Sequence, residues 1–378
     1  MDTLRVGVIG YGYWGPNLTR NFHEIPSANL IAVADLREER LKQALSKYPQ
    51  IIATQDYKEL FDLGLDAVVV STPPATHHQI ARECLEHDLH VLVEKPMTLK
   101  SQDAEDLIQL ADSKGLTLMV GHTFRYNSAV FALKKLIESG ELGKIYYLDA
   151  ARLNLGLFQR DSNVLWDLAP HDISILLYLL DQNPISVSAQ AMSSISEGIY
   201  DVAYINLIFP DNIPAYIHVS WLDPCKVRRI TAVGSKKMAV FNDVESEQKI
   251  KIYDKGVDVP SYTNGFAEFQ WSYRTGDILI PKIRFVEPLR QECQIFLERC
   301  LSHKREGPDR TAPETLTEGL SESWQAPQVC PIDPNCTVCY THQGGPYSCG
   351  RDGLRVVKIL EAAQRSMMNG QSLEVIKW

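Results

Sequence analysis

The stretch LRVGVIGYGYWG at residues 4–15 decides the fold of the first part of the chain. Its VGVI segment is an uncharged apolar run, typical of a strand buried on both faces of a parallel sheet. Gly10, Gly12 and Gly15 follow in the spacing GxGxxG, and Pro16 suits the first turn of a helix. Such glycines allow a tight turn and a close backbone approach to a pyrophosphate. The stretch therefore predicts a strand, a turn and a helix whose N-terminus binds a pyrophosphate.

An acidic residue after the second strand extends this prediction to a dinucleotide. The apolar segment Leu30–Ala34 ends in Asp35, at the offset of about 20 residues expected for an acid that hydrogen-bonds ribose hydroxyls. Asp35 should repel a 2′-phosphate, which favours NAD(H) over NADP(H), although the nearby Arg37 keeps NADP(H) open. The alternative is a strand–turn–helix without a ligand. The expected cofactor contacts here are Gly10, Tyr11, Gly12, Tyr13, Trp14, Gly15, Asp35 and Arg37.

Length, composition and charge limit the class of protein. The 378 residues suffice for about two domains. With 22% charged and 45% hydrophobic residues the composition is that of an ordinary globular protein. A formal net charge of −9 argues against sequence-independent nucleic-acid binding. There is no apolar run of about 18 residues, as a membrane-spanning helix needs, and the first strand begins too early for a signal peptide. We therefore expect a cytoplasmic protein that binds neither nucleic acid nor membranes.

Polar residues follow three further apolar segments, Asp66–Ser71, Leu89–Val93 and Leu116–Val120. Their alternation with helical stretches predicts a doubly wound parallel sheet, in which ligands bind at the carboxyl ends of the strands. We expect cofactor contacts from Ser71, Thr72, Pro73, His77, Glu94 and Lys95. Arg125 and Tyr126, after the last of these strands, either contact the substrate or only pack.

A second polar segment, WDLAPHD at residues 166–172, carries candidate acid–base groups. Asp167 and His171 are four residues apart and share one face of a helix, and Pro170 is expected in the first turn of the apolar helix Ile173–Leu180. With Lys95 they would form a proton-transfer set. The alternatives are a capping or core role for His171 and a helix-cap role for Asp167.

The pattern changes to alternating strands after Lys144, separated by turn residues, as in an antiparallel sheet. We therefore expect a doubly wound α/β domain over residues 1–122 and an α+β domain with a mostly antiparallel sheet over 123–378. The expected strands are Ile145–Arg152, Ile185–Ser193, Val202–Phe209, Ala215–Trp221, Val227–Val233, Met238–Asn242 and Lys249–Tyr253.

A stretch at about residues 308–348 is rich in Pro, Thr, Gly and Ser and is interpreted as an inserted loop. It contains or borders Cys330, Cys336, Cys339 and Cys349. One C-x2-C pair is present, whereas the paired arrangement typical of zinc sites is missing. A structural metal, a disulfide knot and a solvent-exposed insert all remain open, and no metal is assigned to the site.

The motifs together resemble the Gfo/Idh/MocA family, the glucose–fructose oxidoreductase and inositol dehydrogenase group. The matching segments are GYGYWG, the strand that ends in Asp35, STPPATHH, VEKP, GHTFRYN and WDLAPHD. They cover residues 1 to about 305 and resume at about 350; the insert departs from the family pattern. The resemblance implies a Rossmann domain followed by an open sheet that carries the substrate and often the subunit contact.

The resemblance also implies the chemistry: hydride transfer between nicotinamide and a secondary alcohol or ketone of a sugar, with nucleotide sugars the nearest match. Lys95 matches the family's catalytic lysine, and Asp167 and His171 match its D-x-x-x-H pair; Trp166, Asp167, His171, Arg125 and Tyr126 are expected near the substrate. Imidazole suits a group that accepts the hydroxyl proton near neutral pH, and a lysine there stabilises negative charge on the oxygen. A cis Lys95–Pro96 bond would hold that lysine in place.

Two other functions stay open. One is a dehydrogenase of a free sugar or inositol, and the other is an NAD-bound sensor or scaffold without turnover. Retention of Lys95, Asp167 and His171 favours an enzyme, whereas the cysteine-containing insert would suit a partner site. The resemblance implies a homodimer or homotetramer.

Overall fold

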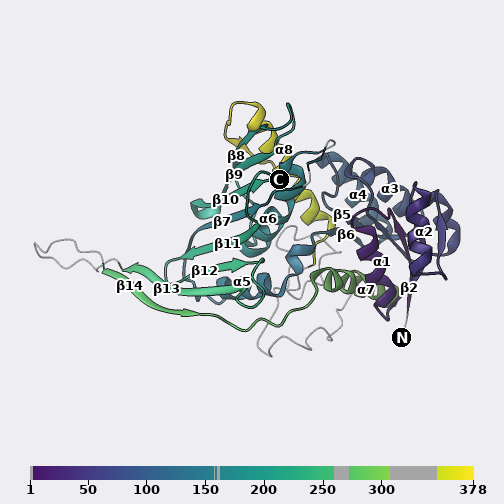
Figure 1. Cartoon of the computed structure of the whole chain (residues 1–378), viewed down its shortest axis with the longest axis horizontal. Helices are drawn as coiled ribbons and strands as arrows, with labels where there is room; N and C mark the ends of the chain where they lie inside the picture. Colours follow the sequence, from purple (N-terminus) through teal and green to yellow (C-terminus); the bar gives the residue numbers. More distant parts are fainter. Residues whose placement is uncertain (1–2, 157, 160–161, 259–271, 307–346) are drawn as a thin grey trace, which may run out of the picture. The chain divides into compact units, whose positions relative to one another are not determined.

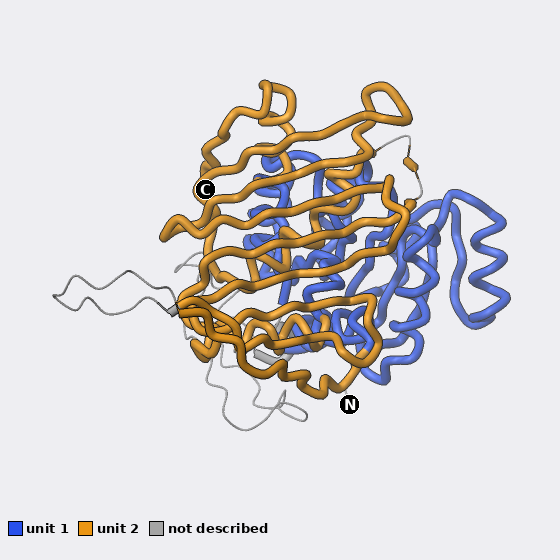
Figure 2. Tube along the Cα trace, turned by 60° about the vertical axis from the view of Figure 1, so that its left-hand side comes forward, with its two compact units in different colours: residues 1–126, 287–358 blue, residues 127–286, 359–378 orange. Residues whose placement is uncertain are grey.

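The computed structural model describes residues 3–156, 158, 159, 162–258, 272–306 and 347–378. The chain divides into two compact units, coloured separately in Figure 2. Unit 1 is formed by residues 1–126 and 287–358, and unit 2 by residues 127–286 and 359–378.

Unit 1 contains a six-stranded parallel sheet in the order β3-β2-β1-β4-β5-β6 (Figure 1). The chain winds outward from β1 in both directions, so the predicted doubly wound Rossmann fold is confirmed. The strands are β1 (Leu4–Ile9), β2 (Ala28–Ala34), β3 (Ile52–Thr54), β4 (Ala67–Val70), β5 (His90–Glu94) and β6 (Leu118–Gly121). Its helices are α1 (Gly15–Glu24), α2 (Glu38–Lys47), α3 (His77–Glu86), α4 (Ser101–Lys114) and α7 (Pro288–Glu306), with short 3-10 turns η1 (Tyr57–Leu63), η2 (Pro74–Thr76) and η3 (Thr123–Tyr126).

The sheet of unit 1 is buried on both faces, which explains its uncharged strand sequences. Alternate strand residues such as Val68 and Val91 pack with Leu85 of α3 and Leu107 of α4 in one core cluster. Residues of the opposite phase, such as Val69, are equally buried. The helices therefore cover both faces of the sheet, and the polar segments follow the carboxyl ends of its strands.

Unit 2, orange in Figure 2, contains a nine-stranded sheet in the order β14-β13-β12-β11-β7-β10-β9-β8-β15. Among its strand pairs, β7 and β10 run parallel and the others antiparallel, so the predicted mostly antiparallel sheet is confirmed. Helices α5 (Ser128–Glu138) and α6 (Val164–Leu180) pack on it. The strands are β7 (Ile145–Leu153), β8 (Ser186–Met192), β9 (Val202–Phe209), β10 (Ile213–Ser220), β11 (Val227–Gly234), β12 (Met238–Asn242), β13 (Ile250–Asp258), β14 (Ser272–Leu279) and β15 (Glu374–Val375), with the 3-10 turn η4 (Pro210–Asn212).

All seven strands predicted after Lys144 are present, and the sequence missed two. These are the edge strands β14 and β15. Most of the β14 side chains are exposed, so the strand lacks the alternation of apolar and polar residues that marks a half-buried strand. Strand β15 is too short to carry a pattern.

The units differ from the predicted boundary at residue 122 in one respect. Helix α7 and the start of α8 (Gly350–Met368) belong to unit 1, although they follow the second sheet in the sequence. Helix α7 contacts α1, where the rings of Phe22 and Phe296 meet edge to face with centroids 6.2 Å apart. The apolar face of α7 is thus buried in the first unit, a tertiary preference that composition does not reveal.

The cysteine-containing insert lies almost entirely outside the described residues, including Cys330, Cys336 and Cys339. Cys349 is described and buried, and its N–H and thiol both contact the carboxylate of Asp352. Within the described part of the chain, no group of three or more His, Cys, Asp or Glu side chains is arranged to hold a metal ion. The helices described there also include none that is long and apolar enough to cross a membrane.

Candidate functional site

The GxGxxG segment forms a tight turn between β1 and α1. Gly10 has a φ of +95°, and a Cβ at this position would lie 2.7 Å from the carbonyl oxygen of Ser71. At Gly15 a Cβ would collide with the carbonyl group of Gly10. Glycine is therefore required at both positions by the turn itself. Ser71 closes the turn, because its Oγ donates a hydrogen bond of 2.7 Å to the Gly10 carbonyl.

Helix α1 begins at the end of this turn without a side-chain cap hydrogen bond at its N-cap, Trp14. Pro16 has no N–H, and the N–H groups of Asn17 and Leu18 donate to the Trp14 carbonyl at 3.0 and 3.1 Å, so the turn and Gly15 supply the N–H groups that can face a ligand. The neighbouring Tyr13 side chain is 80% exposed. Uncapped N–H groups at the positive end of a helix dipole attract an anion. The turn and the helix start therefore fit the pyrophosphate of a dinucleotide.

Asp35 lies beside the glycine turn at the end of β2, with a carboxylate that is only 7% exposed. It accepts hydrogen bonds from the backbone N–H of Tyr11 at 2.7 Å and of Arg37 at 2.9 Å. The guanidinium of Arg40, on α2, lies 3.3 Å from the same carboxylate. A Cβ on Gly12 would be 3.2 Å from this guanidinium. Arg40 is a residue that the sequence analysis missed, since nothing in its helical context marks it as close to the turn.

The segment after β4 carries the remaining expected cofactor contacts. Thr72 is half-buried and Pro73 is exposed at this strand end. The hydroxyl of Thr76 donates to the Pro73 carbonyl at 2.8 Å, which shapes the 3-10 turn η2. Thr72 and Pro73 therefore stay at the carboxyl edge of the sheet, next to the glycine turn that Ser71 closes.

His77 differs from its predicted place in a ligand-facing loop. It is the first residue of α3 and fully buried, with Nδ1 2.8 Å from the Pro96 carbonyl oxygen and Nε2 2.8 Å from that of Thr72. Burial lowers the pKa of His77 below its usual value. A neutral ring has one N–H and donates to one of the two carbonyls. His77 thus links the segment after β4 to the Lys95–Pro96 segment after β5.

Strand β5 delivers the candidate catalytic lysine. Lys95 is half-buried, and the Lys95–Pro96 peptide bond is cis, as the sequence predicted. The backbone N–H of Lys95 donates to the Glu94 carboxylate at 3.2 Å. Burial raises the pKa of Glu94 to about 7, against the opposing effect of the Lys95 charge.

Arg125 and Tyr126 take part in contacts inside unit 1. The Arg125 guanidinium forms an ion pair with Asp352 at 3.1 Å. Tyr126 is fully buried, and its hydroxyl lies 2.9 Å from Oγ of Ser348. Of the two interpretations left open by the sequence, packing is the one that these contacts favour.

Helix α6 of unit 2 carries the other candidate catalytic groups. Asn163 caps it, accepting from the N–H of Leu165 at 3.0 Å and of Trp166 at 3.3 Å. The predicted position of Pro170 in the first turn is wrong, since the helix already begins at Val164 and includes it. The cap and the buried apolar residues of the first turns compensate for the hydrogen bond that the proline removes.

Within α6, hydrogen bonds hold the two residues that precede the proline turn. The indole N–H of Trp166 donates to the side chain of Gln364, and that of Trp221 donates to the Asp167 carboxylate at 3.0 Å. His171, one turn after Asp167, is buried. Asp167 and His171 thus share a helix face in unit 2, whereas the cofactor-type residues and Lys95 belong to unit 1.

The residues of unit 1 fit a dinucleotide on three independent observations. The glycine turn excludes side chains, the α1 N-terminus is uncapped, and an acidic side chain lies beside the turn at the end of β2. Ser71 and Thr72 follow β4, and Glu94 is the last residue of the neighbouring strand β5, with Lys95 directly after it. This is the edge at which open parallel sheets bind nucleotides.

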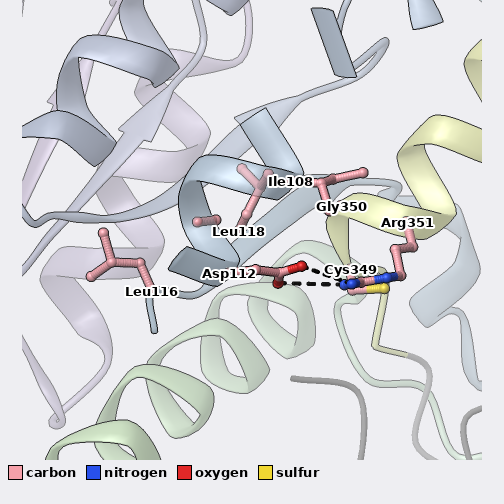
Figure 3. A pocket seen from close by; sticks show the side chains of 8 residues that line it. Ile108, Asp112, Leu116, Leu118, Cys349, Gly350 and Arg351 are labelled. Carbon is pink, nitrogen blue, oxygen red and sulfur yellow. Dashed lines mark hydrogen bonds and ion pairs between the residues drawn. The ribbon is translucent and has the colours of Figure 1, made fainter. Parts of the chain in front are cut away.

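A separate small pocket of unit 1 lies between α4, β6 and the start of α8 (Figure 3). The Arg351 guanidinium and the Asp112 carboxylate face each other there at 2.7 Å, and apolar side chains such as Ile108 and Leu116 form the remaining wall. Neither the glycine turn nor Asp35 lines this pocket. It is therefore distinct from the nucleotide-type edge of the sheet.

Comparison with known families agrees with this geometry. Residues 4–122 match the model described as an oxidoreductase family with an NAD-binding Rossmann fold, and residues 130–240 match the Gfo/Idh/MocA C-terminal domain. The chain belongs to the Gfo/Idh/MocA family of NAD(P)-dependent oxidoreductases.

Three relatives illustrate the range of the family. The chain is 31% identical to the Escherichia coli oxidoreductase YdgJ, which is uncharacterised, over 66% of this chain and 74% of the relative. It is 29% identical to a myo-inositol 2-dehydrogenase of Thermotoga maritima, over 68% of this chain and 80% of the relative. The solved structure of UDP-N-acetylglucosamine 3-dehydrogenase from Acidithiobacillus ferrooxidans superposes with a TM-score of 0.72 at 21% identity, covering 98% of this chain and 100% of that chain, and this likeness concerns the fold alone.

Proposed function

We propose that this protein is an NAD-dependent dehydrogenase that oxidises a secondary alcohol of a sugar, with a nucleotide sugar as the first choice of substrate. The observation that carries the proposal is the glycine turn with its uncapped helix start and Asp35, which together suit a dinucleotide. The cofactor, when bound, supplies the hydride acceptor. In the sheet, β4 lies between β1 and β5. The glycine turn follows β1 and Lys95 follows β5, so both are at the carboxyl edge of the sheet.

Each candidate catalytic residue has a distinct role in this proposal. Lys95 stabilises negative charge on the substrate oxygen, since a cation lowers the cost of an alkoxide-like transition state. His171 accepts the hydroxyl proton when the C–H bond breaks, because an imidazole exchanges protons near neutral pH. Asp167 is the positioning group, and its hydrogen bond from Trp221 supports a fixed orientation.

NAD is the proposed cofactor, with NADP less favoured. The Asp35 carboxylate lies where a ribose would be recognised, and its charge opposes a 2′-phosphate. Arg40 beside it reduces that opposition, because it forms an ion pair with the same carboxylate at 3.3 Å.

An inositol or free sugar is the second candidate substrate. Basic residues of β11 and the following turn would suit a diphosphate, but two of them are engaged in ion pairs: Arg228 with Asp243 at 3.5 Å and Lys237 with Glu141 at 2.9 Å. The Thermotoga maritima relative named a myo-inositol 2-dehydrogenase supports the same alternative.

Assembly and location complete the proposal. Aromatic side chains on the nine-stranded sheet, among them Tyr146, Tyr204 and Tyr216, are exposed and suit contact with a second copy in a homodimer or homotetramer. The buried thiols of Cys84, Cys293 and Cys300 suit the reducing cytoplasm.

The test is hydride transfer measured as NADH formation with UDP-N-acetylglucosamine, myo-inositol and free hexoses. We expect Lys95→Met and His171→Asn to lower kcat/KM by about 10²–10⁴-fold, the usual range for lost charge stabilisation and general acid–base catalysis. Matched controls at exposed positions, Lys100→Met and His87→Asn, should retain the activity of the unaltered chain. Absence of NADH formation with every substrate, or full activity of Lys95→Met, would overturn the proposal.

A further inference from the structure

Three buried polar side chains of unit 1 lie near the carboxyl ends of β5 and β6. They are Glu94, His122 and Glu292, which are 7%, 1% and 0% exposed. Both ring nitrogens of His122 and Oε1 of Glu292 lack a hydrogen-bond partner among the described residues. Buried polar atoms are normally paired, so this cluster requires an explanation.

The end of β6 contacts both carboxyl groups. Glu94 is in register with Gly121, and a Cβ on Gly121 would lie 3.1 Å from Cδ and 3.2 Å from Oε1 of Glu94. The Glu94 side chain therefore lies against the end of β6. Thr123 follows there, and its hydroxyl donates a hydrogen bond of 2.8 Å to Oε2 of Glu292, on α7.

The neighbouring cations form ion pairs with another carboxylate or act on Glu94. Asp352 forms ion pairs with Arg125 at 3.1 Å and with Arg355 at 3.4 Å, so both guanidinium groups already face a carboxylate. Lys95 acts electrostatically on Glu94. Within the described residues Glu292 forms no ion pair, and the charge that acts on it is that of Glu94.

The other titratable neighbours stay neutral and supply no positive charge. Burial and then the charge of Arg125 lower the pKa of His122 to about 3. Burial raises the pKa of the Tyr126 hydroxyl and of the Cys293 thiol above their usual values. Glu94 is therefore relieved in part by Lys95, through its charge and its backbone N–H, whereas these neutral groups supply no charge that would relieve Glu292.

Two buried carboxylates with so little positive compensation cannot both be ionised without a large cost. Burial raises the pKa of Glu292 well above its ordinary range, and the charge of Glu94 raises it further. Because the groups are coupled, the proton belongs to the pair rather than to one residue.

We propose that Glu94 and Glu292 form a carboxyl pair that holds at least one proton at neutral pH, and that Glu292 is a positioning residue for the segment carrying Lys95. With the proton on Glu292, Glu94 carries the single negative charge and accepts the backbone N–H of Lys95. When the pair loses its last proton, Glu94 and Glu292 are both negatively charged, and their repulsion acts on the segment that carries Lys95. The part concerning Lys95 rests on the proposed function, whereas the shared proton does not.

Infrared spectroscopy of the full chain detects the proton directly. Spectra are recorded in D2O at about pH 8, where an isolated carboxyl group would be ionised. We expect a C=O stretch of a protonated carboxyl group that Glu292→Gln removes and that Glu39→Gln, at an exposed position of α2, retains. A band that is absent from the unaltered chain, or that persists in Glu292→Gln, would overturn the shared proton.

Thermal unfolding supplies a second readout. The folded pair binds more protons than unfolded carboxyl groups, which titrate near about 4.3, so the pair makes stability fall as the pH rises from there through the raised pKa values. Glu292→Gln removes one of the two titrating groups, so the stability of the variant falls less with rising pH. Between about pH 5 and pH 8, its melting temperature should therefore rise by several degrees relative to that of the unaltered chain. A relative loss over that interval would mean that Glu292 is needed as a carboxylate, which contradicts the proposal.

Turnover separates the positioning role from the proposed function. We expect kcat/KM of the unaltered chain to fall at alkaline pH, where the pair loses its last proton, and this fall to be absent in Glu292→Gln. Identical pH profiles of the two proteins would overturn the positioning role. Absence of turnover in the unaltered chain would instead contradict the proposed function, while the infrared band would still decide the shared proton.

Discussion

At the scale of single residues, Asp35 serves two purposes that the sequence motif does not separate. Its carboxylate holds the glycine turn through the N–H of Tyr11 and also faces the guanidinium of Arg40. In the proposed function, the same charge opposes a 2′-phosphate and so favours NAD. Arg40 would favour NADP instead, since a guanidinium binds phosphate well.

Replacing Asp35 by Asn removes the charge and keeps the shape, although the single amide oxygen can accept only one of the two backbone N–H groups, of Tyr11 and Arg37, that the carboxylate accepts. We expect Asp35→Asn to shift the ratio of NADPH to NADH affinity toward NADPH by about 10–100-fold, equivalent to the roughly 1.5–3 kcal/mol of a hydrogen bond to a charged group. The additional change Arg40→Gln should reverse most of this shift, because it removes the nearby cation. Fluorescence titration with each cofactor measures both affinities.

The exposed Glu38, at the start of α2, provides the control. Glu38→Gln removes one negative charge close in sequence and should leave the ratio unchanged. An unchanged ratio in Asp35→Asn would show that Asp35 does not select the cofactor.

At the scale of elements, a buried ion pair fastens α6 to β7 in unit 2. The Arg152 guanidinium contacts the Asp172 carboxylate through two hydrogen bonds of 2.7 and 3.0 Å. Both side chains are almost fully buried. This pair fixes the rotation of the helix that carries Asp167 and His171, and WDLAPHD therefore contains a structural aspartate beside its candidate catalytic histidine.

Removing one partner should cost more than removing both. We expect Asp172→Asn to lower the free energy of unfolding by about 3–5 kcal/mol, because it removes the carboxylate charge that faces the buried Arg152 guanidinium. The double change Arg152→Met with Asp172→Leu should cost less than the single change. Urea denaturation measures both values, and Asp181→Asn, at the exposed C-terminal end of α6, is the control. A loss for Asp172→Asn no larger than that for Asp181→Asn would refute this role.

At the scale of the whole molecule, unit 1 is assembled from two distant chain segments. Phe296 and Leu297 of α7 are fully buried, and Ser348 hydrogen-bonds both the hydroxyl of Tyr126 and the carbonyl of Val120. The first segment alone would therefore expose the apolar surface that α7 covers, including Phe22.

A fragment of residues 1–122, the domain that the sequence suggests, tests this dependence. We expect it to bind a hydrophobic dye, to be cleaved rapidly by proteases and to unfold without a cooperative transition, since its core lacks the packing of α7. The full chain under the same conditions is the reference. A cooperative transition of the fragment at the midpoint of the full chain would contradict the assignment of α7 to the core of unit 1.

The sequence by itself determined the class of fold and the position of the nucleotide-type edge. Short apolar runs report burial on both faces of a parallel sheet. Gly10 reports a positive φ, and Gly15 reports a close backbone approach at which a Cβ would collide with the Gly10 carbonyl. These signals are local, because they depend on one strand or one turn. The same holds for the seven strands after Lys144, whose alternation reflects one buried face.

Only the tertiary structure decided which side chains meet across long sequence distances. His77 belongs to the interior because two carbonyl groups from separate segments converge on it, and Glu292 meets Thr123 because α7 packs beside the end of β6. Arg125 and Tyr126 are engaged by Asp352 and Ser348 for the same reason. Periodicity and motif spacing depend on the environment of a residue within its own element. They do not identify the partner that a distant element supplies.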